Sequence, residues 1–136
     1  MLITMANATK VSAIMFCALV FLQVSSGGNV RVPAVMTVNS FQQGGSGGGP
    51  ASCDGQYHSG SECIVSLSSD WYAGGKRCGK MIRIKDNSSI LGGITVIVVD
   101  EYDGCDGELG ASPAVWHNFG LDPNLGEVNV TWYDLS

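Results

Sequence analysis

The sequence predicts a small, mainly β domain that carries one short helix and is held by disulfides. Three observations favour this fold class. Runs of β-branched and aromatic residues are short and are separated by turns, a pattern more typical of a β-barrel than of a parallel α/β sheet. Four cysteines follow residue 50, an even count. Glycine supplies 19 of 136 residues, about twice its usual share, so we expect tight corners.

The first residues have the order of a secretory signal peptide. Lys10 precedes the apolar run Val11–Val24, and the small residues of Ser25–Gly28 follow it. A helix that spans a bilayer needs about 20 apolar residues, so this run is short for an anchor. We therefore predict a signal peptide at residues 1–26, one secreted domain at 27–136, and no membrane association once the signal is removed.

Charge and cysteine content exclude some classes of partner and cofactor. Loss of Lys10 leaves six basic residues against 12 acidic ones, which argues against nucleic acid as a partner because its binding relies on Lys and Arg at phosphates. In an exported chain Cys53, Cys63, Cys78 and Cys105 predict two disulfides, with three connectivities open. The spacing lacks a Cys-x-x-Cys pair, so zinc is disfavoured, and we expect neither a metal nor a cofactor.

Five segments have the composition of strands. Gly93–Val99 is apolar apart from Thr95, which predicts a buried central strand. The glycine run Gly44–Pro50 has neither the lysine nor the following helix of a phosphate-binding loop, so a flexible loop is expected. Turns are expected at Asp70–Gly75 and Asp86–Ser89. The predicted strands are Ala34–Phe41, Glu62–Ser68, Met81–Lys85, Gly93–Val99 and Glu127–Tyr133.

One helix is well marked near the C-terminus. Ser112 can cap its start, Pro113 suits its first turn, and Gly120 can close it. The apolar face would comprise Val115, Trp116 and Phe119, with His117 on the solvated side.

Several motifs together resemble the plant kiwellin and ripening-related protein family. The resemblance covers about Met36 to the C-terminus, without the cysteine-rich N-terminal module of full-length kiwellins. The motifs, in family order, are Gly47-Gly48-Gly49-Pro50, Cys53-Asp54-Gly55-Gln56-Tyr57-His58-Ser59, Leu67-Ser68-Ser69-Asp70-Trp71-Tyr72, Arg77-Cys78-Gly79-Lys80-Met81-Ile82-Arg83-Ile84, Val98-Val99-Asp100-Glu101, and Gly120-Leu121-Asp122 with Gly126-Glu127-Val128 and Val130-Thr131-Trp132.

This resemblance implies a six-stranded double-psi β-barrel, similar to barwin and to the first domain of expansins. It also implies a secreted, non-enzymatic plant protein of the apoplast, tied to ripening or defence. By analogy with barwin, Cys53 would pair with Cys78, leaving Cys63 with Cys105. The chain departs from the family at Tyr102, where a cysteine is usual, at Cys63, where one is not, and in the shortened loop Gly107–Ala111.

Asp100 is the strongest candidate for catalysis. It ends an apolar strand, where partial burial could raise the proton affinity of a general acid. Glycoside cleavage normally requires a second carboxylate, and neither Asp54 nor Glu101 is singled out by spacing. The favoured interpretation is structural: Asp100 accepts hydrogen bonds from backbone donors at a barrel corner, or pairs with Arg77 or Arg83.

Other candidate residues point to binding. His58 is interpreted as a hydrogen-bonded loop residue rather than a base. Trp71 and Tyr72, in their turn, are the aromatic side chains expected to be exposed, either to stack on sugars or to anchor a protein partner. Asn87 and Asn129 begin N-glycosylation patterns. The candidate binding residues are Asp54, Tyr57, His58, Trp71, Tyr72, Lys76, Arg77, Asp100, Glu101 and Asp103.

Three functions follow from these features. The first is a secreted protein that binds another extracellular protein, including one from a pathogen, through loops Asp54–Ser61, Trp71–Arg77 and Asp100–Glu108. The second is a cell-wall polysaccharide-binding module that uses Trp71 and Tyr72. The third is a glycan-cleaving enzyme centred on Asp100.

Overall fold

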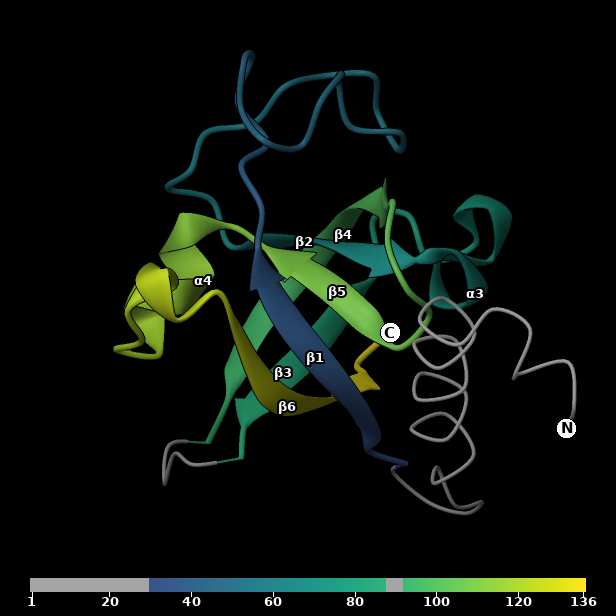
Figure 1. Cartoon of the computed structure of the whole chain (residues 1–136). Coiled ribbons are helices and arrows are strands. Elements are labelled where there is room, and N and C mark those ends of the chain that lie inside the picture. Colours follow the sequence, from purple (N-terminus) through teal and green to yellow (C-terminus); the bar gives the residue numbers. More distant parts are fainter. Residues whose placement is uncertain (1–29, 88–91) are drawn as a thin grey trace, which may run out of the picture.

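The computed structural model describes residues 30–87 and 92–136. The expected signal peptide and the domain boundary after residue 26 lie outside these residues. Within them, six strands form a closed barrel in the order β1-β5-β2-β4-β3-β6 (Figure 1). The strands are β1 (Val32–Val38), β2 (Ile64–Ser68), β3 (Met81–Asp86), β4 (Ile94–Tyr102), β5 (Glu108–Ala111) and β6 (Glu127–Asp134). The short helices are α3 (Ser69–Tyr72) and α4 (Pro113–Asn118), and single 3-10 turns occupy Ala73–Gly75 and Pro123–Leu125.

Both parallel and antiparallel pairs close the barrel. Strand β1 runs parallel to β5 and β2 runs parallel to β4, whereas the other four neighbouring pairs are antiparallel. Parallel neighbours require crossover connections rather than tight hairpins. The long connection of residues 39–63 joins β1 to β2, which are separated by β5 in the ring, and it lies above one end of the barrel in Figure 1.

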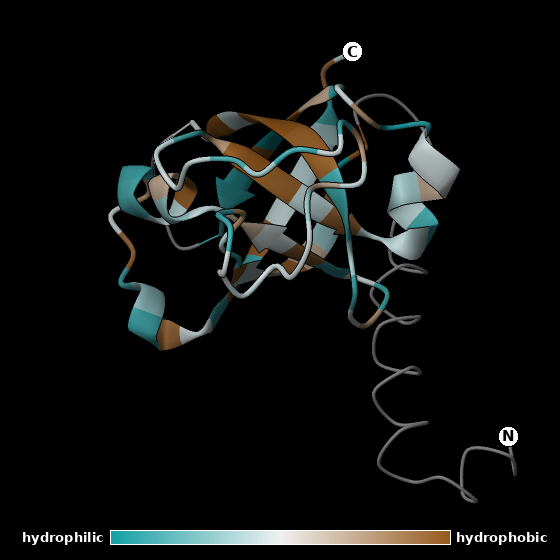
Figure 2. Ribbon diagram, turned by 90° about the horizontal axis from the view of Figure 1, so that it is seen from above, coloured by the Kyte–Doolittle hydropathy of each residue, from teal (hydrophilic) through white to brown (hydrophobic). Residues whose placement is uncertain are grey.

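Alternation along the strands places one set of side chains in the barrel interior. In β3, Ile82 and Ile84 are fully buried, whereas Met81 is exposed and Arg83 and Lys85 are half-buried on the outer surface. Hydrophobic residues, coloured brown, recur along the strands in Figure 2. The largest fully buried side chains are Trp116, Trp132, Met36, Leu67, Ile82, Ile84 and Leu109. Burial of this apolar surface is the main source of stability.

The helix α4 matches its prediction, with one difference. Pro113 occupies its first turn, and Val115, Trp116 and Phe119 are buried. Ser112 is the N-cap residue, but its hydroxyl donates to the Glu62 carbonyl (2.5 Å) instead of capping the helix. The Ser112 side chain therefore ties the start of α4 to the segment before β2.

Three predictions made from local sequence patterns are wrong. Strand β5 lies where a shortened loop was expected, because its four residues form a strand only by pairing with β1 and β2. Helix α3 occupies part of the turn predicted at Asp70–Gly75. Strand β4 extends to Tyr102, and Ile97 within it is 43% exposed although the run was expected to be buried throughout.

The disulfide prediction is half correct. Cys53 and Cys78 are bonded, as expected. The Cys63–Cys105 pairing is wrong, because Cys63 is a free thiol and Cys105 is disulfide-bonded. Cys63 precedes the start of β2, which lies level with Ile97, whereas Cys105 follows the far end of parallel β4. A strand rises about 3.3 Å per residue, so the two lie too far apart for a disulfide.

Candidate functional site

The end of the barrel covered by residues 39–63 gathers most of the predicted binding residues; we call it the loop end. The covering segment is attached to β4 by backbone hydrogen bonds, among them the Cys53 N–H to the Val99 carbonyl (3.0 Å). A small apolar cluster lies beneath it, formed by Phe41, Ala51, Ile64 and Val99. The Cys53–Cys78 disulfide adds a covalent link to the turn before β3. The segment is thus held firmly despite its many glycines.

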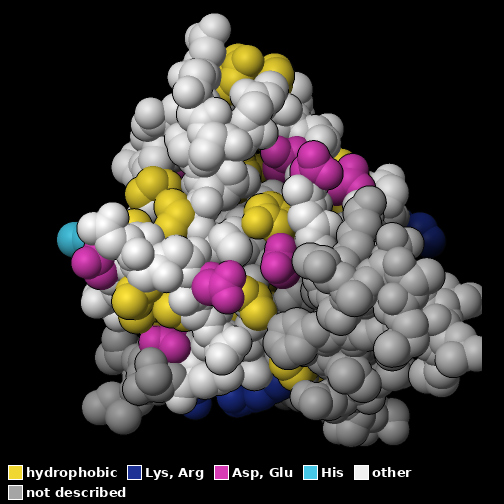
Figure 3. Space-filling view, viewed as in Figure 1, with side chains coloured by type: hydrophobic (Ala, Val, Ile, Leu, Met, Phe, Trp, Pro, Cys, Tyr) yellow, Lys and Arg dark blue, Asp and Glu magenta, His cyan; other side chains and the backbone are white. Residues whose placement is uncertain are grey.

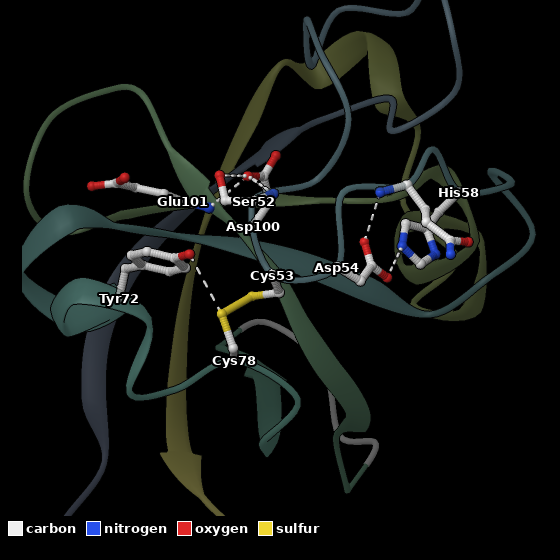
Figure 4. Close-up of a disulfide and its surroundings, with 9 residues drawn as sticks. Ser52, Cys53, Asp54, His58, Tyr72, Cys78, Asp100 and Glu101 are labelled. Atoms are coloured by element: carbon white, nitrogen blue, oxygen red, sulfur yellow. Dashed lines mark hydrogen bonds and ion pairs between the residues drawn. A yellow bond between two sulfur atoms is a disulfide. The ribbon is translucent and has the colours of Figure 1, made fainter.

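Asp100, in β4, holds this segment through hydrogen bonds from Ser52, a contact that we call the Ser52–Asp100 brace. It is 8% exposed, and its Oδ1 accepts hydrogen bonds from the Ser52 backbone N–H (2.9 Å), the Ser52 hydroxyl (2.7 Å) and the Glu101 N–H (2.8 Å) (Figure 4). This arrangement matches the structural interpretation of Asp100. The suggested arginine partners are engaged elsewhere, since Arg77 pairs with Asp134 and Arg83 donates to Gly92 and Thr95.

A cleft of about 390 Å³ opens beside this brace. Its walls come from the end of β1, the glycine-rich segment Ser46–Gly48 and the end of β4, and it contains the side chains of Asp100, Glu101 and Asp103. Glu101 is exposed and accepts a hydrogen bond from the Ser69 hydroxyl (2.6 Å). In the view of Figure 3, Asp and Glu side chains gather on this part of the surface. The cleft is therefore polar and negatively charged.

On the other side of the loop end, the His58 imidazole lies between the carboxylates of Asp54 and Glu62. Its Nε2 lies 2.8 Å from Asp54 Oδ2 and its Nδ1 lies 3.1 Å from Glu62 Oε1. Partial burial lowers the pKa of His58, but the hydrogen bonds and charges of Glu62 and Asp54 outweigh it, so the pKa is raised. A protonated imidazole can donate to both carboxylates at once, which makes His58 a clasp for its loop and leaves it no free nitrogen for catalysis.

A second hollow, of about 360 Å³, adjoins this clasp and is lined mainly by apolar groups, including Ile64, Ile97 and the disulfide. Tyr57 lies in the same loop as His58 and is 40% exposed. Figure 4 places Asp54 and Glu101 on opposite sides of the Ser52–Asp100 brace. Two concave sites thus flank one rigid support.

The expected exposure of Trp71 and Tyr72 is wrong. Trp71 is 4% exposed and packs edge-on against Trp132, with ring centroids 5.2 Å apart. Tyr72 is 8% exposed, and its hydroxyl donates to Cys78 Sγ (3.4 Å). Helix α3 turns both rings toward the barrel, so neither offers a flat face to a sugar. Arg77 also serves the fold, because it donates to the Trp71 carbonyl (2.7 Å) as well as to Asp134. Lys76 is exposed beside it.

Two further carboxyl groups are perturbed near the β4–β5 connection. Burial, followed by the charge and hydrogen bonding of Asp70, raises the pKa of Asp106. Burial also raises the pKa of Glu108, with Glu127 adding repulsion and the Cys105 backbone N–H opposing the rise. Within residues 30–87 and 92–136, no group of three or more His, Cys, Asp or Glu side chains is arranged to hold a metal ion.

Ser52, Glu62 and Ser69 were missed by the sequence reasoning, although each contacts a predicted site residue. Only the four-residue spacing of Asp54, His58 and Glu62 offered a signal in the sequence. Asn87 and Asn129 are both exposed and adjacent, with the Asn87 N–H 3.5 Å from the Asn129 carbonyl.

Comparison with known proteins identifies the family to which this chain belongs. The kiwellin-1 family model matches residues 22–135. The chain belongs to the kiwellin-1 family. It is 52% identical over 114 residues to a ripening-related protein of Oryza sativa subsp. japonica, covering 76% of this chain and 70% of that protein. It is 51% identical to ripening-related protein grip22 of Vitis vinifera and 46% identical to kiwellin of Actinidia chinensis var. chinensis, covering 74% of this chain in each case. It spans only 51% and 53% of those two relatives.

Solved structures confirm the double-psi β-barrel fold. A Clavibacter michiganensis expansin in complex with cellohexaose superposes with a TM-score of 0.62 at 24% identity, over 76% of this chain and 50% of the expansin. A Streptomyces papain inhibitor superposes with a TM-score of 0.58 at 18% identity, over 84% of this chain and 98% of the inhibitor. At these identities the likeness concerns the fold alone. Among the described residues of this kiwellin-1 family member, no helix has the length and apolar character needed to cross a bilayer.

Proposed function

We propose that this kiwellin-1 family member is a secreted, non-enzymatic protein that binds a protein partner through its loop end, in a defence or ripening context. The observation that carries the proposal is the set of contacts that hold residues 51–62 in place. The Cys53–Cys78 disulfide, the Ser52–Asp100 brace and the His58 clasp all hold this segment from different sides. A surface ordered before binding loses little entropy on association, which favours affinity for a protein.

The chemistry of the loop end indicates the kind of partner. Tyr57 offers an exposed aromatic side chain, the type enriched at interface hot spots. The loop end also carries an acidic rim, formed by Asp54 and Glu62 at one hollow and by Glu101 and Asp103 at the other. Such a rim is complementary to a basic surface and would accelerate encounter with one. The partner we propose is therefore an extracellular protein, including one secreted by a pathogen, with a basic patch around an apolar pocket.

The alternatives have less support. Glycan cleavage needs a carboxyl group free to transfer a proton, whereas Asp100 Oδ1 accepts three hydrogen bonds that position a loop. Polysaccharide binding through Trp71 and Tyr72 loses its basis because both rings are buried. The cleft beside β4 remains an alternative polysaccharide site, and the expansin that binds cellohexaose shares the fold.

Capture from apoplastic fluid tests the proposal. The immobilised wild-type domain is compared with Tyr57→Ala and with the double variant Glu101→Lys/Asp103→Lys, and retained proteins are identified by mass spectrometry. The matched control is Leu125→Ser, an exposed apolar residue in the connection before β6. We expect one partner to be lost with both loop-end variants and kept with the control. Retention on insoluble cell-wall glycan that these variants abolish, with no protein captured, would replace this proposal with the polysaccharide alternative.

A further inference from the structure

The outer surface of β3, β4 and β6 forms a second surface, which meets the loop end at Ile97. The strand register arranges its side chains in rows. Met81 lies opposite Ile97 on β4, and its carbonyl accepts the Leu135 N–H (2.9 Å). These three apolar side chains are 43%, 43% and 44% exposed. A soluble domain of this size usually exposes large apolar residues singly, so three in one row mark a contact surface.

The next rows are cationic. Arg83 lies opposite Thr95 on one side and Tyr133 on the other, and the Arg31 guanidinium stacks 5.7 Å from the centre of the Tyr133 ring. Lys85 follows two residues further along β3 and faces Thr131. Lys80, just before β3, lies level with the fully buried Val98, so strand alternation does not place its side chain on this face. We call this surface the basic–apolar face, comprising Arg31, Met81, Arg83, Lys85, Ile97, Tyr133 and Leu135.

The charges on this face are not neutralised within the described part of the chain. Arg77 is the one Lys or Arg there that forms a salt bridge to a carboxylate. Arg83 donates hydrogen bonds to the Gly92 carbonyl and the Thr95 hydroxyl, and these neutral acceptors do not compensate its positive charge. The domain is acidic as a whole, yet the residues of this face include Arg31, Arg83 and Lys85 and no Asp or Glu, so positive charge is locally concentrated there. Such separation favours an oppositely charged partner at that side.

We propose that the basic–apolar face is a second docking surface, specific for an acidic protein segment that carries apolar side chains. Carboxylates of that segment would lie over Arg83 and Lys85, and its apolar side chains would cover Met81, Ile97 and Leu135. A row of apolar side chains beside the cations favours a protein over an acidic polysaccharide, since sugar acids have no large aliphatic groups to cover it. The cations of this surface are not part of the acidic rim, so the proposal does not rest on the function proposed above; of the residues of this face, Ile97 also lines the hollow beside His58.

Selection of short random peptides displayed on phage tests this assignment, with the disulfide-intact domain as bait. We expect the enriched peptides to combine Asp or Glu with aliphatic or aromatic residues. The best one, made synthetically, should bind the variant Lys85→Glu about tenfold more weakly than wild type, and its affinity should fall with added salt. Ile97→Thr should weaken it as well, since threonine is compatible with an outer strand position.

Matched control variants distinguish loss of binding at the basic–apolar face from general effects of changing surface charge or apolar surface. Lys76→Glu reverses an exposed charge outside the face, and Leu125→Thr alters an exposed apolar side chain outside it; both should bind the peptide like wild type. Tyr57→Ala should also leave binding unchanged, which keeps this test distinct from that of the loop end. Enrichment of neutral or basic peptides, or equal binding by Lys85→Glu, would overturn the proposal. So would binding of polygalacturonate that depends on Lys85 when no acidic peptide is enriched.

Discussion

The Cys53–Cys78 disulfide should be a major source of stability, and the sequence supplies a matched control for measuring its effect. The bridge closes a loop with a sequence separation of 25. In the chain-entropy description, a loop of that length stabilises the fold by about 3.5 kcal/mol, chiefly by restricting the unfolded chain. The native-state contribution is local, because the bridge fastens residues 51–56 to the turn that precedes β3.

The test compares wild type with the double variant Cys53→Ala/Cys78→Ala in urea, followed by circular dichroism. With a urea dependence of about 1.5 kcal/mol per M, the loss corresponds to a midpoint lower by about 2 M. The control is Cys63→Ala, which removes a half-buried free thiol and should change the free energy of unfolding by less than about 1 kcal/mol.

Two results would refute this reasoning. A loss below about 1 kcal/mol in the double variant would mean that Asp100 and the backbone hydrogen bonds hold the loop without the bridge. A loss in Cys63→Ala as large as that of the double variant would mean that Cys63 is bonded in the folded protein. A difference confined to the double variant agrees with the structure.

Three further outcomes follow from the contacts at the loop end and in α3. Asp100→Asn should lower the free energy of unfolding by about 1–3 kcal/mol, because a charged acceptor of several hydrogen bonds becomes neutral; urea unfolding measures this, and a loss of reducing-sugar release would instead support catalysis. His58→Gln should lower the free energy of unfolding most below about pH 6.5, and its difference in that free energy from wild type should disappear as pH rises through the raised folded-state pKa of His58. Urea unfolding at several pH values measures this difference, and a difference that grows with pH would contradict the clasp. Trp71→Ala should destabilise the fold by about 3–5 kcal/mol as measured by thermal unfolding, whereas an exposed sugar-binding ring would leave the melting temperature unchanged.

The stability contribution of His58 has a definite sign. Its pKa is raised in the folded state, so the protonated form binds Asp54 and Glu62 there and contributes fully below the unfolded-state value of about 6.5. Acidic conditions down to about pH 5 therefore favour the ordered loop.

The features that local patterns predicted are those whose environment is set by neighbours along the chain. Alternation in Met81–Asp86 marks β3, because a strand sends successive side chains to opposite faces. Ser112, Pro113 and Gly120 delimit α4 because each residue type favours one helix end. The same alternation in β3 contained the outer row of Met81, Arg83 and Lys85, although only the barrel showed what lies beside it.

By itself, the sequence determined a mainly β domain with one marked helix and an acidic balance of charge, since periodicity, caps and composition are local properties. Tertiary structure alone decided that Glu108–Ala111 forms a strand, that Trp71 is core, and that Cys63 remains free. Each of these depends on pairs far apart in the chain: β5 exists through β1 and β2, the Trp71 ring packs on Trp132, and Cys63 and Cys105 lie at opposite ends of a parallel strand pair. Closure of the barrel sets these distances, and no local pattern encodes them.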